Sequence, residues 1–426
     1  MANRMRSIDH FLHHTAARLN RRRRRWLGVF IAFRLTILLL MVLSQATVLQ
    51  KGQWTQYLYF RYVVELTDRG YYPLIGHWIE YPPLFPWLSV GLYRLAGLAT
   101  TGAAKFVLFY GLLGLVFVAA ECGVLVFLYK IAVLLYNEQQ AMVAALIFAL
   151  TALPTYIVYG WFDPIAAFFL FWGLDRLLTG RTGQSALAAA LGGLTKLFPL
   201  MLAAVGFRLL PTWRQKSRYV LWVVVLTVAP LIPFALARPA VMSASLRWLL
   251  NKSTYQTIWA MVDGYYSYGV APGAPRFLDL SAADWVDHPT RVPWNLVTAV
   301  FGVVGLYIYT RPLGANVKRG AVILSGIIMQ MMILYLKGFS PQFIIWFLPF
   351  VPLILPNARG LLYSIGLSAL NALEFPVYFT FLEGQTAVLG GIIIARTLLC
   401  AVIAADYWRL YRQHPAPPST GRMALP

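Results

Sequence analysis

Long apolar runs, separated by short polar or basic stretches, dominate this chain. A helix needs roughly 20 apolar residues to cross the hydrocarbon core of a bilayer, and runs of this kind recur too often for one soluble core. The pattern therefore predicts an all-α polytopic membrane protein with about eleven transmembrane helices. Residues 84–98 form a shorter run, expected to be an interfacial helix or a steep entry into the membrane. The unbroken spans that we expect are residues 26–49, 106–136, 141–159, 164–178, 219–237, 293–310, 322–336, 344–355, 361–381 and 387–408.

One further apolar run, residues 185–210, is interrupted in its middle by polar and helix-breaking residues. Basic residues flank both of its ends, so a single crossing would leave one basic end outside, against the positive-inside rule. Two half-length helices that meet near Lys196 avoid this conflict, and such broken helices are tolerated where they line a cavity. We therefore predict a helix break within the segment that contains Gly192, Gly193, Lys196 and Pro199.

The chain divides into three parts by composition. Residues 1–25 are basic, residues 26–412 hold all the predicted spans as a single transmembrane domain, and the Pro-rich residues 413–426 are expected to be a flexible cytoplasmic tail. Two long polar segments, about 50–94 and 238–292, interrupt the spans, and the alternation of basic and acid-bearing loops places both of them outside. Both segments therefore fall on one face of the membrane, as a one-sided reaction site requires.

The net charge of +21 accompanies a composition that is 59% hydrophobic and only 12% charged. Much of the charge precedes the first span, which is the positive-inside signature of a cytoplasmic N-terminus in a multi-pass protein of the cell membrane. The charge is thus a topology signal, and we expect no nucleic acid partner. The same tract can bind anionic lipid head groups, as an alternative to topology alone. The arginines concerned are Arg4, Arg6, Arg18 and Arg21 to Arg25.

The first polar segment concentrates acids and aromatic rings. Its start is expected to be a helix over residues 54–69, ended by Gly70 in a left-handed cap. Arg61 and Glu65 lie four residues apart, so Glu65 is either the partner of a surface ion pair or a catalytic acid. Asp68 would lie in the last helical turn, where its charge faces the negative end of the helix dipole, so it needs a partner or a purpose.

Glu80 is followed by Pro82 and Pro83, which hold it on a stiff, extended segment where the loop meets the membrane. A carboxylate positioned in this way can accept a proton from an attacking hydroxyl group. The alternative is that Glu80 caps a helix or pairs with Arg61 or Arg69. His77 precedes Glu80 by three residues, and because no third metal ligand is recognisable by spacing, a hydrogen-bonding or base role is favoured over a metal site.

Three charged side chains lie inside apolar runs, where each is costly unless it is paired or faces a cavity. For Lys196 we retain two interpretations: it binds a phosphate group, or it snorkels or pairs with Asp163. Arg34 and Glu121 are expected to pair with each other.

Four short motifs occur in an order that resembles the GT-C superfamily of membrane glycosyltransferases, and within it the bacterial polyprenol-phosphate mannosyltransferase-like proteins of glycosyltransferase family 87. The similar pattern runs over most of the chain. The motifs are Gly70-Tyr71-Tyr72-Pro73 with Glu80-Tyr81-Pro82-Pro83-Leu84, then Gly160-Trp161-Phe162-Asp163, then Gly193-Leu194-Thr195-Lys196-Leu197-Phe198-Pro199, then Ser340-Pro341-Gln342-Phe343 with Trp346 and Pro349.

The resemblance implies a GT-C-like helix bundle with large external loops. It also implies transfer of a hexose, with mannose the first candidate, from a polyprenyl-phosphate donor to a lipid, glycan or protein acceptor on the outer face. An acid of the first loop would act as the base of an inverting reaction. No cofactor is indicated, although a divalent cation is compatible with the chemistry. The expected catalytic residues are Glu80, Asp68 and Glu65, and the expected substrate-binding residues are Lys196, His77, Tyr81, Asp163 and Gln342.

The chain departs from this family at one position. Relatives carry an Asp near the start of the loop helix, where this chain has Trp54-Thr55-Gln56. Gln56 cannot act as a base, so another loop acid has taken the role, the acceptor chemistry differs, or the protein is inactive. Two other functions therefore stay open: a polytopic transporter or lipid flippase, and a non-catalytic GT-C-like scaffold.

Overall fold

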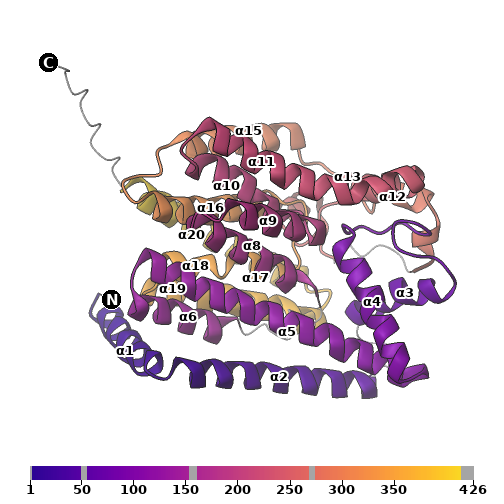
Figure 1. Ribbon diagram of the computed structural model, residues 1–426, viewed down its shortest axis with the longest axis horizontal. Coiled ribbons are helices and arrows are strands. Elements are labelled where there is room, and N and C mark those ends of the chain that lie inside the picture. Colours follow the sequence, from indigo (N-terminus) through magenta and orange to yellow (C-terminus); the bar gives the residue numbers. More distant parts are fainter. Residues whose placement is uncertain (1, 49–54, 153–160, 268–273, 414–426) are drawn as a thin grey trace.

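The computed structural model describes residues 2–48, 55–152, 161–267 and 274–413 (Figure 1). All regular structure in these ranges is helical, and the only pairings of the β type in them are two isolated bridges, Pro73 with His77 and Tyr255 with Gly338. The predicted all-α fold is therefore confirmed for the described residues.

Six helical stretches are long and apolar enough to cross a membrane, and five shorter apolar helices accompany them. The chain is thus a polytopic membrane protein, whereas the figure of about eleven spans stays a prediction. The six long stretches are Arg23–Val42, Gly102–Leu135, Trp213–Ala237, Val317–Tyr335, Ala358–Leu382 and Thr386–Arg412. The five shorter ones are Leu84–Ala99, Glu138–Thr151, Phe198–Leu209, Trp294–Thr310 and Pro341–Ile354.

The helices of the N-terminal half are α1 (Ala2–Asn20), α2 (Arg23–Val48), α3 (Thr55–Asp68), α4 (Leu84–Ala99), α5 (Gly102–Leu135), α6 (Glu138–Thr151), α8 (Asp163–Leu178), α9 (Thr182–Thr195), η1 (Phe198–Leu200) and α10 (Met201–Leu209). Those of the C-terminal half are α11 (Trp213–Val228), η2 (Ala229–Leu231), α12 (Ile232–Ala237), α13 (Pro239–Asn251), α14 (Ile258–Asp263), η3 (Ala274–Leu278), η4 (Ser281–Asp284), α15 (Trp294–Thr310), α16 (Val317–Tyr335), η5 (Pro341–Phe343), α17 (Ile344–Phe347), α18 (Phe350–Ile354), α19 (Ala358–Ala372), η6 (Leu373–Leu382) and α20 (Thr386–Arg412).

The predicted helix break near Lys196 is present. Helix α9 ends at Thr195, Lys196 itself is extended (φ −159°, ψ 139°), and η1 follows at Phe198. The chain after α9 can pack closely against the end of that helix because Gly192 has no side chain. A Cβ atom at Gly192 would lie 2.6 Å from the Cβ atom of Pro199. The glycine and the proline that interrupt the apolar run thus pack against each other and end the helix there.

The buried charges Arg34 on α2 and Glu121 on α5 form the predicted ion pair. Arg34 Nη2 lies 3.1 Å from Glu121 Oε1, and both side chains are fully buried. Arg34 also donates a hydrogen bond to the carbonyl oxygen of Ala149 at 3.3 Å. Because an unpaired charge at the centre of a bilayer costs about 2.5–3.5 kcal/mol, this pairing is what allows both residues to lie within apolar helices.

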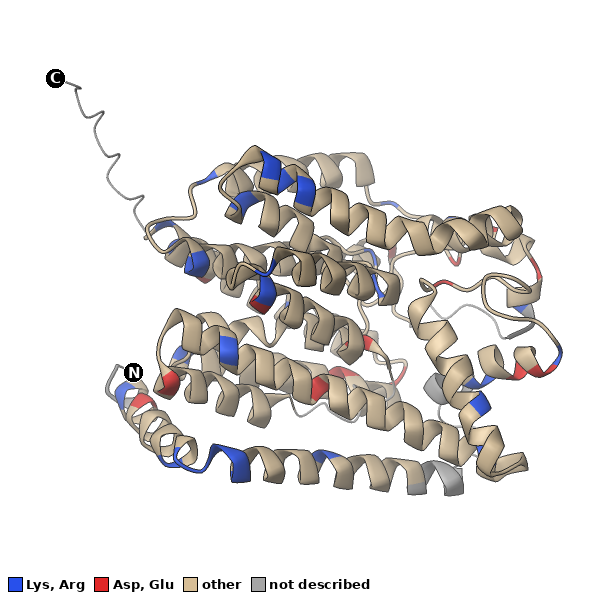
Figure 2. Ribbon diagram, in the orientation of Figure 1, with Lys and Arg blue, Asp and Glu red and all other residues tan. Residues whose placement is uncertain are grey.

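The two ends of the bundle differ in what covers them. Helix α1 crosses one end, whereas α3, α4 and α13 gather at the opposite end (Figure 1). Lys and Arg residues concentrate at the end that α1 crosses, around the connection from α1 to α2 and at the start of α11 (Figure 2). The two long polar segments of the sequence therefore meet at the end of the bundle away from α1.

Candidate functional site

The first polar segment folds as the sequence predicts and is anchored to the second. Helix α3 ends at Asp68, and Gly70 adopts the left-handed conformation (φ 85°) that permits the chain to turn. Trp78 is fully buried, and its indole Nε1 donates to the carbonyl oxygens of Arg276 at 2.9 Å and of Asp279 at 2.8 Å. One tryptophan thus fixes the segment before Glu80 against residues almost two hundred positions later.

Glu80 lies at the junction of the two segments. Its side chain is largely buried, and its Oε2 atom accepts a 2.7 Å hydrogen bond from Nε1 of Trp248 on α13. Lys252 Nζ lies 3.5 Å from the same oxygen. The ion-pair partner of Glu80 is therefore Lys252, and not Arg61 or Arg69, as sequence spacing had suggested as an alternative to catalysis.

Lys252 is a half-buried cation beside this carboxylate, with 30% of its side chain exposed. Burial opposes its charge, but Tyr255 and Glu80 together outweigh that effect and raise the pKa of Lys252 above its ordinary value. The ammonium group also lies 5.0 Å from the centre of the Tyr255 ring. Lys252 is therefore positively charged at neutral pH, next to the acid that we expect to be the base.

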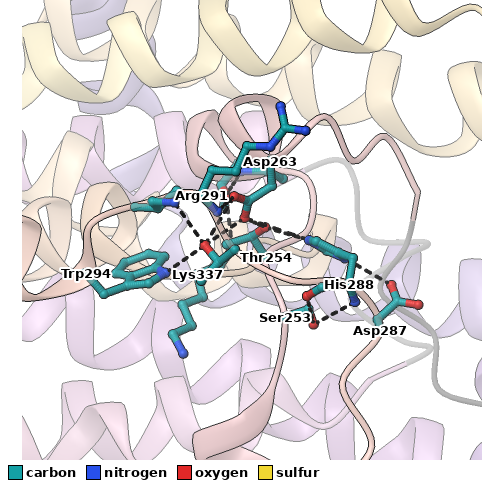
Figure 3. A network of polar contacts seen from close by, with 12 residues as sticks. Ser253, Thr254, Asp263, Asp287, His288, Arg291, Trp294 and Lys337 are labelled. Carbon is teal, nitrogen blue, oxygen red and sulfur yellow. Dashed lines mark hydrogen bonds and ion pairs between the residues drawn. The ribbon is translucent and has the colours of Figure 1, made fainter.

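The segment that follows Lys252 is held by a polar network (Figure 3). Asp263 accepts hydrogen bonds from Thr254 Oγ1 at 2.5 Å and from the backbone N–H of Arg291 at 2.6 Å. His288 contacts the same segment twice. Its Nε2 atom lies 3.0 Å from Thr254 Oγ1, and its backbone N–H donates to Ser253 Oγ at 3.3 Å. This network fixes residues 253 and 254, and through them the backbone that carries Lys252.

Lys196 and Asp163 form the second part of the site. Lys196 Nζ lies 2.8 Å from Asp163 Oδ1, and the same oxygen accepts a 2.6 Å hydrogen bond from Trp346 Nε1. The carboxylate is fully buried, and its other oxygen, Oδ2, has no hydrogen-bond partner among the described residues. Asp163 also opens α8, where the helix dipole favours a negative charge. The pairing of Lys196 with Asp163, one of the two interpretations that the sequence left open, is therefore present.

Aromatic rings surround the ammonium group of Lys196. The centroids of Phe343 and Trp346 lie 4.4 and 4.7 Å from Nζ, and those of Phe162 and Tyr81 lie 5.2 and 5.7 Å away. Such faces attract a cation electrostatically and exclude water from it. Four aromatic rings and one carboxylate, that of Asp163, thus surround the ammonium group of Lys196.

Tyr81 connects the two parts of the site. It directly follows Glu80, and its ring faces Lys196. Glu80 and Lys252 also lie close enough to Lys196 for their charges to act on it. Gln342, buried in η5, is adjacent in sequence to Phe343, which packs on Lys196. The structure therefore brings together Glu80, Tyr81, Lys196 and Asp163 from the expected set, with Gln342 beside them.

The remaining expected residues have other partners. Glu65 pairs with Arg61 at 2.8 Å, and Asp68 accepts a 2.6 Å hydrogen bond from the Tyr93 hydroxyl and pairs with Arg94 at 3.1 Å. Asp68 thus has partners that offset its unfavourable position at the negative end of the helix dipole. Neither acid is joined to Glu80 by any contact in the described part of the chain.

His77 is 1% exposed and lies near the ring of Phe277, with a centroid distance of 6.3 Å. Burial lowers the pKa of His77 to about 4, so the imidazole is neutral at pH 7. A neutral ring contributes no positive charge toward a phosphate group. The ring contact that His77 makes is with Phe277, in the second polar segment.

Sequence reasoning did not join Trp248, Lys252 and Arg276 to Glu80. The spacing of Trp248 and Lys252, four residues apart at the end of a short helix, places both on one helical face and was an available signal. Arg276 lies 4.8 Å over the Trp248 ring, and its Nε and Nη1 atoms are buried without a hydrogen-bond acceptor among the described residues. Arg276 is thus a further cation close to Trp248, the hydrogen-bond donor of Glu80.

Three features bear on access and on metal binding. The described ranges hold no group of three His, Cys, Asp or Glu residues able to bind a metal ion. A pocket of about 10 Å³ beside Lys252, lined by Trp248, Ser253, Trp285 and Asp287, has room for one water molecule. Trp54, Gly160 and the side chain of Gln56 lie outside the described residues. The consequence of the missing Asp, that another loop acid acts as the base, therefore stays a prediction.

No protein-family model matches this chain, and no curated protein is detectably similar to it.

Proposed function

We propose that this protein is a membrane glycosyltransferase that moves a hexose, mannose being the first candidate, from a polyprenyl-phosphate donor to a lipid, glycan or protein acceptor. The observation that carries the proposal is the ion pair of Glu80 with Lys252, together with the packing of the next residue, Tyr81, on Lys196. This arrangement offers one carboxylate for the acceptor hydroxyl and two ammonium groups for the phosphate of the donor. Three separate parts of the chain supply them.

The proposed reaction is a single displacement. Glu80 accepts the proton of the acceptor hydroxyl as its oxygen attacks the anomeric carbon, and the bond from that carbon to the phosphate oxygen breaks. The electron pair of that bond leaves with the phosphate, whose growing charge Lys252 and Lys196 stabilise. Because attack and departure occur on opposite faces of the sugar, the configuration at the anomeric carbon is inverted.

In this proposal the bundle has the GT-C-like arrangement of about eleven transmembrane helices, of which the six long apolar stretches are the longest members. The end crossed by α1 faces the cytoplasm of the cell, and the end that holds Glu80 faces outside. The concentration of Lys and Arg around α1 and α11 supports this orientation (Figure 2). A donor with its lipid tail in the outer leaflet would then reach Glu80 at the membrane boundary.

Two other functions make different predictions. A transporter or lipid flippase would move its substrate across liposomes and would work without Glu80. A non-catalytic scaffold would lose nothing on replacement of any acid. The one-sided placement of the charged cluster favours the enzyme, because alternating access requires a site that opens to both faces.

The proposed activity is tested by incubating the purified protein with a panel of polyprenyl-phosphate sugars and acceptor lipids. We expect release of polyprenyl phosphate and a glycosylated acceptor for one donor of the panel. The absence of transfer with every donor, together with substrate movement in liposomes, would instead identify a transporter.

The orientation is tested by labelling single cysteines in a variant that lacks Cys122 and Cys400. Ile75 and Val286 are exposed at the Glu80 end, and Trp213 is exposed at the start of α11. Cysteines at Ile75 and Val286 should react with a membrane-impermeant reagent in intact cells, and one at Trp213 only after permeabilisation. Labelling of the Ile75 position only from the cytoplasmic side would reverse the orientation.

A further inference from the structure

Helix α1 is fixed across one end of the bundle by buried contacts. Leu12 and Ala16 are buried against Met142 and Ile147 of α6. Asp9 Oδ1 accepts a 2.6 Å hydrogen bond from the backbone N–H of Ala358, at the start of α19. The position of α1 relative to the bundle is therefore set by packing and by a hydrogen bond.

The connection from α1 to α2 is fixed as well. At the end of α1, the Asn20 side chain donates to Glu138 Oε2 at 3.1 Å and accepts from the Tyr129 hydroxyl at 3.2 Å. The next five residues, Arg21 to Arg25, are all exposed. With Asn20 they line an open hollow of about 500 Å³, which we name the arginine elbow.

The charges of the arginine elbow are uncompensated. Arg23 to Arg25 occupy the first turn of α2, which contains no acidic residue. The backbone N–H groups of a first helical turn lack partners, and the helix dipole is positive there, so neighbouring cations are unfavourable. No ion pair from Arg21 to Arg25 occurs within the described part of the chain. An anion in the hollow would compensate both the guanidinium groups and the helix dipole.

The elbow lies where α2 changes from charged to apolar. Trp26 follows the arginines directly, and aromatic residues are common at a membrane interface. Further along α2, Val29 and Leu39 are exposed apolar side chains, as expected of residues that face lipid. On α1, Phe11 is 66% exposed, an apolar side chain placed to enter the same interface. In the orientation proposed above, the arginines directly before this apolar stretch lie near the lipid phosphate groups.

We propose that the arginine elbow binds the phosphate of an anionic phospholipid, such as phosphatidylglycerol, at the membrane surface. Guanidinium groups bind phosphate oxygens in a bidentate manner, and the hollow gathers five of them beside the first turn of α2. The bound lipid would offset the repulsion among the arginines at the connection from α1 to α2, at the cytoplasmic end in our orientation. The proposal does not depend on the proposed transferase activity.

Native mass spectrometry of the full-length protein in detergent, titrated with phosphatidylglycerol or phosphatidylcholine, tests the proposal. We expect the wild-type protein to prefer phosphatidylglycerol. Each basic residue near an anionic surface contributes about 1 kcal/mol, or about fivefold in affinity. The triple variant Arg21→Gln, Arg22→Gln, Arg23→Gln should therefore lose phosphatidylglycerol affinity by about tenfold or more. Its affinity for phosphatidylcholine should be unchanged.

Two control variants distinguish binding at the arginine elbow from a general effect of the net charge of the protein. The triple variant Arg21→Lys, Arg22→Lys, Arg23→Lys keeps the charge and should retain most of the affinity. The triple variant Arg214→Gln, Lys216→Gln, Arg218→Gln removes two exposed cations and a half-buried one from the start of α11, a helix capped by Thr212, and should change the affinity by less than about twofold. Equal losses at α11 and at the elbow, or no loss in the elbow glutamine variant, would overturn the proposal. A melting curve for each variant shows whether it is folded.

Discussion

Replacing Glu80 with Gln is expected to lower sugar transfer by about 10²-fold or more while leaving expression and folding intact. The amide oxygen of Gln can still accept the hydrogen bond that Trp248 donates to Glu80 at 2.7 Å, so the shape of the site is preserved. What is lost is basicity and the charge opposite Lys252. The measurement is the rate of polyprenyl phosphate release at saturating donor, with the protein amount checked by fluorescence-detected chromatography.

Two acids on the same loop serve as matched controls for Glu80. Glu65→Gln removes one partner of an exposed pair with Arg61 and should leave the rate nearly unchanged. Asp68→Asn weakens contacts with Tyr93 and Arg94, and should affect stability more than the chemical step. Full activity in Glu80→Gln with loss in Asp68→Asn would transfer the base role to Asp68. Full activity in both single variants and in the double variant would reject a loop-acid mechanism.

Replacing Lys196 with Ala is expected both to destabilise the protein and to abolish use of a phosphate-linked donor. Removing the ammonium group leaves Asp163 as a fully buried carboxylate whose charge has lost its partner. Breaking a buried ion pair in this way costs about 3–5 kcal/mol, which should appear as a lower melting temperature. Lys196→Arg keeps a cation in the aromatic surroundings and should restore part of both properties.

The double variant Lys196→Met, Asp163→Asn separates the two effects. It removes both charges, and the amide oxygen of the introduced asparagine can still accept the hydrogen bond from Trp346. We expect the melting temperature to return close to that of the wild-type protein while donor use stays lost, because the cation that faces the phosphate is still missing. Recovery of transfer in this variant would show that phosphate recognition does not need Lys196, and would leave Lys252 as the cation beside Glu80 that performs it.

Local features of this protein followed from its sequence alone. The apolar runs predicted the long helices, because a membrane span needs a continuous stretch of apolar side chains. Gly70 predicted the end of α3, and the spacing of Arg61 and Glu65 predicted their ion pair, because both depend on neighbours within one helical turn. The break at Lys196 followed from glycines, a lysine and a proline inside one apolar run.

Pairings between buried charges were predictable in part. Arg34 with Glu121, and Lys196 with Asp163, were identified because an unpaired charge in an apolar environment is so unfavourable that few partners remain. The sequence nevertheless left Lys196 with two interpretations. The contact with Asp163 became visible only when α8 and the broken helix packed together.

The surroundings of Glu80 were decided by tertiary structure. Its hydrogen-bond donor Trp248 lies 168 residues away in the chain, and no spacing rule relates the two. They meet because Trp78 anchors the first polar segment to residues 276 and 279 of the second, and because the network around Asp263 holds the backbone next to Lys252. Sequence determined which acid stood on the stiffest backbone, since proline geometry is local. Packing of distant segments determined which cation it faces, since that contact depends on how the whole bundle closes.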